Sequence, residues 1–127
     1  MMREDYLMRQ VASLGQVLAR ILRLRTAGEV STAQADCARA LREIFSCEPD
    51  FLALLDASHV LESLHLTSAA APSEPVRDLA RVAAELLDEY GRLEHAAGRA
   101  DAAAPLHAHA RAIRVRMEPP ATRAPVQ

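Results

Sequence analysis

Apolar residues near the start of the chain recur at intervals of four and three residues, the spacing of one face of an α-helix. From Arg3 to about Thr26 this stripe consists of Leu7, Val11, Leu14, Leu18 and Ile21. Polar residues follow a similar spacing on the far side. The pattern therefore predicts one long amphipathic helix, which ends near Gly28 because glycine readily takes the left-handed conformation found at helix termini.

A second helix is expected directly after this break. Ser31 and Gln34 have the spacing of a capping box. The apolar stripe that follows consists of Ala33, Cys37, Ala40, Leu41 and Ile44. Because only a short loop separates the two helices, we expect an antiparallel hairpin over residues 3–46.

The middle of the chain predicts a short helical connector over residues 48–66. Pro49 suits an early helical turn and Asp56 suits an N-cap, so brief helices are expected at 49–55 and 57–65. The segment 67–75 contains two prolines and many small residues, which is typical of a break between helices.

The remaining apolar pattern predicts a second hairpin over residues 74–117. Its first helix runs from about Glu74 to Ala97, after Ser73 as the cap, and ends at Gly98. Its second helix carries the stripe Ala103, Leu106, Ala110, Ile113 and Met117.

Composition supports an all-α fold, because alanine and leucine supply 43 of the 127 residues and both lead the helix-propensity scale. We therefore expect a single helical domain over residues 1–117, made of two antiparallel hairpins and a connector. The last ten residues, 118–127, contain three prolines and no apolar period, which predicts a disordered tail.

The two hairpins repeat one arrangement of small residues. Gly28, Ala33 and Ala40 recur as Gly98, Ala103 and Ala110, with the same spacings of five and seven. This arrangement resembles tetratricopeptide helix hairpins. The resemblance implies that the first helix of each pair lines a groove for a ligand.

The chain also resembles a family of short, all-helical bacterial proteins that open with an Asp-Tyr-hydrophobic-Met-Arg motif. The matching segments here are Asp5-Tyr6-Leu7-Met8-Arg9, Leu14-Gly15 and Leu18-Ala19-Arg20-Ile21-Leu22. That family has no assigned activity, so the resemblance implies a fold and no chemistry.

Charge and cysteine content exclude several classes of protein. The formal net charge is −2 and all 15 basic residues are arginine, so no surplus positive charge favours nucleic acid. Two arginine sets would carry that function if it existed: Arg9, Arg20 and Arg23, and Arg111, Arg114 and Arg116. Cys37 and Cys47 lack the spacing of a zinc site or a disulfide framework, and no signal peptide or membrane segment is evident, so we expect a cytoplasmic protein.

The titratable residues do not assemble a recognisable catalytic or metal site. His107 and His109 point about 200° apart on a helix, so we expect no shared metal, with His107 near the core margin and His109 exposed. Cys37 is expected to act as a small core residue, and Cys47 lacks a neighbouring base. The sequence therefore predicts no catalytic residues, no metal, no cofactor and no enzymatic activity.

A partner-binding face is the leading functional hypothesis. Its residues, on the first helix of the second hairpin, are Glu85, Asp88, Glu89 and Arg92. Such an acidic face suits a basic or amide-rich peptide, although a merely solvated face has the same pattern. An alternative is self-assembly, in which Leu7, Val11, Leu14, Leu18 and Ile21 exceed what their own hairpin covers and pair in an antiparallel homodimer.

Overall fold

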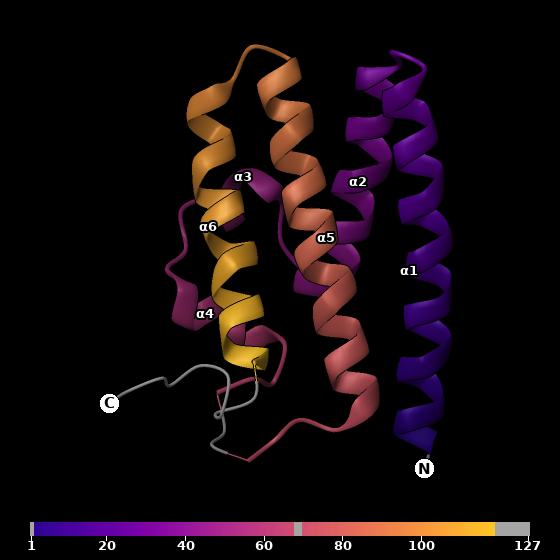
Figure 1. The fold of residues 1–127 in the computed structure, drawn as a ribbon, viewed down its shortest axis with the longest axis vertical. Coiled ribbons are helices and arrows are strands. Elements are labelled where there is room, and N and C mark those ends of the chain that lie inside the picture. Colours follow the sequence, from indigo (N-terminus) through magenta and orange to yellow (C-terminus); the bar gives the residue numbers. More distant parts are fainter. Residues whose placement is uncertain (1, 68–69, 119–127) are drawn as a thin grey trace.

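The computed structural model describes residues 2–67 and 70–118, apart from the side chains of the first two of these. The regular structure of these residues is entirely helical (Figure 1). The helices are α1 (Met2–Thr26), α2 (Val30–Phe45), α3 (Pro49–Leu52), α4 (Ala57–Ser63), α5 (Glu74–Ala96) and α6 (Ala100–Met117).

The four long helices form the two predicted hairpins. In each pair, α1 with α2 and α5 with α6, the chain runs along one helix and returns antiparallel along the next (Figure 1). Helices α1 and α5 lie side by side and run in the same direction. Helices α3 and α4 form the connector, and α4 packs against α6. The predicted all-α class and both hairpins are therefore confirmed.

Helix α5 is the centre of the packing. It contacts α1, α2 and α6, and almost its whole length is buried on one side. Small residues let neighbouring backbones approach this helix closely, and large ones fill the space between them. Side chains of both kinds have no exposed surface on α5: Ala80, Ala83, Ala84, Leu86, Leu87 and Leu93. One continuous apolar cluster joins residues of all six helices.

The helix ends follow the glycine and Asp56 predictions but not the capping box. Gly28 and Gly98 have φ values of +84° and +88°, in the left-handed region. Asp56 accepts a hydrogen bond from the backbone N–H of His59 at 3.3 Å and so caps α4. The capping box was wrong: α2 begins at Val30, before Ser31, and the Gln34 side chain donates to Glu94 on α5 instead.

The connector and the C-terminal tail differ from the long helices in how far they match the predictions. Helices α3 and α4 are shorter than predicted and end at Leu52 and Ser63. Except for Glu118, the predicted tail over 118–127 lies outside the described residues. Among the helices that are described, none is both long enough and apolar enough to cross a membrane.

Candidate functional site

The four residues predicted for partner binding share α5 but differ greatly in burial. The Glu85 side chain is 56% exposed and that of Arg92 is 49% exposed, so both are accessible. The Asp88 side chain is only 14% exposed, and that of Glu89 is 1% exposed. A partner can therefore contact Glu85 and Arg92 directly, but it cannot reach the carboxylate of Glu89.

Glu89 joins α5 to α1 inside the core. Its Oε2 accepts a hydrogen bond from Nε of Arg25 on α1, and its Oε1 accepts one from Nη1 of Arg92 at 3.1 Å. Both carboxylate oxygens thus have a charged donor, which is the condition for burying a carboxylate at tolerable cost. The residue is a structural part of the helix packing.

Asp88 joins α5 to α6 in a similar way. It accepts hydrogen bonds from Nδ1 of His107 at 2.8 Å and from Nη1 of Arg114 at 2.6 Å. Burial alone would raise the pKa of Asp88, but these bonds and the Arg114 charge outweigh it and lower the pKa below its usual value. Gly91 makes room for the imidazole, since a Cβ there would lie 2.7 Å from Nε2 of His107.

Two adjoining hollows lie on the surface above these ion pairs. The first has a volume of about 410 Å³ and is lined by Asp88, Arg92, His107, Arg111, Arg114, Val115 and Glu118. The second, of about 310 Å³, is lined by Arg81, Glu85, Arg114, Met117 and Glu118. Arg114 and Glu118 line both. We call the residues of the two hollows together the α5–α6 site.

The groups that a partner can reach at the α5–α6 site are largely cationic. Arg92, Arg111 and Arg114 are exposed or partly exposed around the first hollow, whereas Asp88 lies beneath them. The sequence suggested an acidic face. Its acidic character is reduced because arginines from α1, α5 and α6 cover two of the three carboxylates.

Two further buried carboxylates also form bonds between elements. Asp36 on α2 accepts from Nε of Arg20 on α1 at 2.7 Å. Glu94 on α5 accepts from Gln34 on α2 and from two guanidinium nitrogens of Arg99. Sequence reasoning missed the bonds between helices because their partners are distant: Gln34 lies 60 residues from Glu94, and Arg25 lies 64 residues from Glu89.

Of the two histidines on α6, His107 is partly buried at the core margin as expected, and His109 is placed differently. His109 was predicted to be exposed and this was wrong: it is 4% exposed, and its Nε2 lies 2.9 Å from the carbonyl oxygen of Leu52 on α3. The bond satisfies the buried imidazole and ties α6 to the connector. Nowhere in residues 2–67 and 70–118 do three metal-ligating side chains come together.

The two cysteines occupy contrasting environments. Cys37 is fully buried, and its Sγ donates a weak hydrogen bond to the Leu86 carbonyl oxygen at 3.4 Å. Burial, followed by the nearby charges of Glu89 and Asp36, raises the pKa of this thiol far above its usual range. Cys47 is only partly buried, and burial with the Glu48 charge raises its pKa as well.

We expect the native chain to show only one reactive thiol. Cys47 should react slowly with a disulfide reagent at neutral pH, and Cys37 should react only after unfolding, because the thiolate is the reactive form. Counting the protein thiols that react with and without denaturant measures this difference. A Cys47→Ser variant shows whether Cys47 is the thiol that reacts in the native chain. Rapid native reaction of Cys37 would contradict the packing of α2 on α5.

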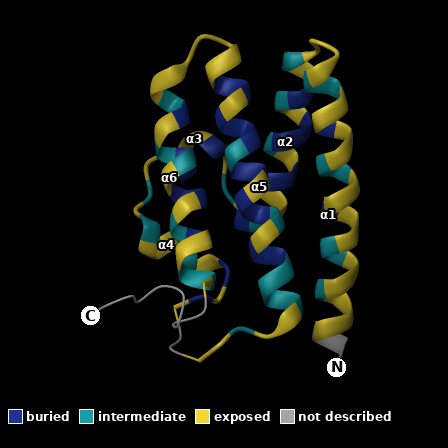
Figure 2. Cartoon of the chain, in the orientation of Figure 1, coloured by how far each residue is buried: buried dark blue, intermediate teal, exposed yellow. Residues whose placement is uncertain are grey.

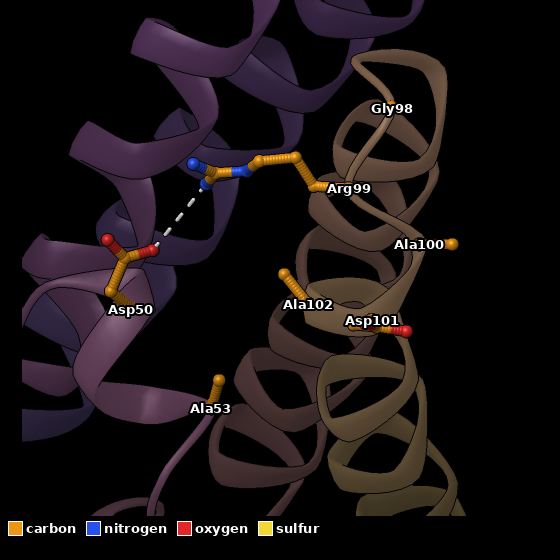
Figure 3. Close-up of a pocket in the computed structure, with 7 residues that line it drawn as sticks. All are labelled: Asp50, Ala53, Gly98, Arg99, Ala100, Asp101 and Ala102. Carbon is orange, nitrogen blue, oxygen red and sulfur yellow. Dashed lines mark ion pairs between the residues drawn. The ribbon is translucent and has the colours of Figure 1, made fainter.

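A third hollow lies between α3 and the beginning of α6 (Figure 3). It has a volume of about 590 Å³, and Arg99 reaches across it toward Asp50 at 3.8 Å. The remaining lining is mostly glycine and alanine, and the Asp101 carboxylate points away from Asp50. Because Arg99 is already bound to Glu94, the hollow offers little chemistry for recognition.

The stripe predicted for self-association is largely used within the chain. Leu14 and Ile21 are 1% and 0% exposed, so they belong to the intrachain core. The other three members pack against that core and are only partly buried: Leu7, Val11 and Leu18. Leu14 and Ile21 are therefore not available to a second copy, and only part of the predicted stripe is accessible.

Comparisons with known proteins identify no relative. No protein-family model matches the chain, and neither a curated protein nor a solved structure shows significant similarity to it.

Proposed function

We propose that the chain is a non-enzymatic protein–protein interaction module with tetratricopeptide-like hairpins, and that it binds a peptide or helix of a partner at the α5–α6 site. The observation that carries the proposal is the gathering of three accessible guanidinium groups, from two helices, around one shallow hollow. Shallow, open surfaces of this kind suit an extended or helical peptide better than a small substrate, which needs an enclosed pocket.

The free hydrogen-bond donors at the site favour a partner segment that carries carboxylates. A guanidinium has five N–H donors. Arg111 uses none of them in an ion pair with another described residue, and Arg92 is paired through Nη1 alone. Carboxylates bind arginine strongly and often through two bonds. An acidic partner therefore fits this surface better than the basic peptide suggested by the sequence.

The packing of the helices supports the tetratricopeptide-like part of the proposal. Helices α1 and α5, the first helices of the two hairpins, lie side by side in the same direction, and α2 packs on α5 (Figure 1). The exposed side of α5 carries Arg81, Glu85 and Arg92, so it presents charged groups where the resemblance places the ligand.

The ion pairs make nucleic acid a less favoured partner. Arg20 and Arg114 already neutralise carboxylates of the same chain, which leaves fewer charges for phosphates. A reducing, cytoplasmic setting is also part of the proposal, and the two unpaired cysteines support it.

The proposal is tested by selecting peptides from a random displayed library on the immobilised chain. We expect enrichment of sequences rich in Asp and Glu, and a selected peptide should lose at least about tenfold in affinity against Arg111→Glu, since reversal replaces an attraction by a repulsion. Calorimetric titration measures this loss.

The matched control is Arg9→Glu, an exposed arginine on α1 that lines neither hollow of the site. It should bind the same peptide as tightly as the original chain. Failure to enrich any acidic sequence, or an equal loss in both variants, would refute binding at the α5–α6 site.

A further inference from the structure

The outward side of α1 carries a second apolar stripe that no other described element covers. It consists of Met8, Ala12, Gly15, Ala19 and Leu22, again at intervals of four and three, and every member is exposed. Met8 and Leu22, the two large members, are 59% and 39% exposed. Helix α1 forms one edge of the molecule, and its outward side is open along its length (Figure 2).

The stripe is nearly symmetric about its centre. Gly15 has a large residue seven positions away on each side, Met8 and Leu22, with an alanine between in both directions. A Cβ added at Gly15 would meet no atom within 4 Å, so the surface at the centre is open. Small residues there allow a second helix to approach closely.

Because the stripe is nearly symmetric, the same stripe on a second copy of α1 is complementary to it. When two copies of this helix cross antiparallel at Gly15, Met8 of one copy lies opposite Leu22 of the other. The large residues at the ends then cover each other while the glycines meet at the centre. Such a contact is isologous, the usual form in homodimers.

Two charged residues beside the stripe determine the direction of pairing. Asp5 and Arg23 are 18 residues apart, which is about five helical turns, so they lie on the same flank of α1. Both are exposed, and neither forms an ion pair within the described part of the chain. In an antiparallel pair the twofold axis is perpendicular to both helices and parallel to the contact surface. It therefore places this flank on the same side of the contact in both copies.

The antiparallel register brings these opposite charges together. With the two glycines opposed, Asp5 of one copy lies within two residues, or about 3 Å along the axis, of Arg23 of the other. Two such pairs form, one at each end. In a parallel pair the twofold axis runs along the helices and places this flank on opposite sides of the contact in the two copies, so neither Asp5–Arg23 ion pair could form.

We propose that two copies of this chain associate through the outer stripe of α1, antiparallel and centred on Gly15. This surface differs from the Leu7–Ile21 stripe suggested by the sequence, which is used within the chain. It also shares no residue with the α5–α6 site, so the proposal is independent of the proposed function.

Sedimentation equilibrium of the full chain tests the proposal. The average mass should rise from 13.8 kDa toward twice that value as the concentration increases from micromolar to millimolar. Gly15→Glu should remain monomeric, because it places two carboxylates at the centre of the contact. The open space around Gly15 lets the variant fold, which circular dichroism verifies. Arg111→Glu is the matched control and should dimerise normally.

Charge reversal tests the direction of pairing. Asp5→Arg and Arg23→Asp should each weaken association by about tenfold or more, because each variant replaces two attractions by two repulsions. The double variant should return to within about threefold of the original chain, since its charges are complementary again. A chain that stays monomeric at every concentration, a dimer indifferent to Gly15→Glu, or a double variant no better than the single ones would overturn the proposal.

Discussion

Replacing Arg25 and Arg92 together by methionine is expected to lower the free energy of unfolding by about 3–5 kcal/mol. The reason is that Glu89 has a 1% exposed side chain and accepts hydrogen bonds from both arginines. Without them a carboxylate stays buried with no charged partner. Methionine keeps much of the length of the arginine stem, so the variant isolates the loss of charge and hydrogen bonding.

Replacing Glu89 and keeping its two arginine partners should lower the free energy of unfolding much less. Glu89→Met removes the buried charge, and the two arginines, 37% and 49% exposed, can turn their guanidinium groups toward water. We expect a loss of no more than about 1 kcal/mol, since an apolar replacement of similar size often substitutes well for a buried ion pair. Urea unfolding followed by circular dichroism measures both variants.

The triple variant, with methionine at all three positions, is the control for this asymmetry. It should recover most of the stability lost by the double variant, because no charge remains buried. A triple variant as unstable as the double one would mean that the arginines stabilise α1 on α5 through packing of their stems and not by neutralising Glu89.

The buried faces of the long helices could be predicted because burial imposes a local rule. Leu14 and Ile21 on α1 follow the helical spacing, and both are in the core. The ends of α1 and α5 could also be predicted locally, because Gly28 and Gly98 have positive φ values that other residues adopt only at a cost. Information of this kind lies within a few residues of sequence.

The polar contacts of the core could not be predicted, because their cause is tertiary. Gln34 has the spacing of a capping residue, yet its amide bonds to Glu94, 60 residues away. His109 lies three residues after Leu106 and four before Ile113, both buried, but the Leu52 carbonyl oxygen that satisfies its imidazole comes from α3, 57 residues away. The Glu85–Arg92 segment was likewise judged by its charge alone, without the arginines that α1 and α6 bring to it.

Leu86→Ala is expected to lower the free energy of unfolding by about 2–5 kcal/mol, because Leu86 has no exposed surface and its truncation leaves a cavity in α5. Helix α5 contacts α1, α2 and α6, so the cavity should weaken both hairpins together. We therefore expect a single transition at a lower denaturant concentration, followed in parallel by circular dichroism and by exposure of the Cys37 thiol.

The comparison with Leu54→Ala controls for the substitution itself, since Leu54 is 81% exposed and should change stability by less than about 0.5 kcal/mol. The number of transitions then tests whether residues 1–117 act as one domain. Cys37 lies on α2 and bonds to α5, so its exposure reports contact between the hairpins. If the Cys37 thiol became reactive well before helical signal was lost, the hairpins would be separate folding units, and the shared core around α5 would not be cooperative.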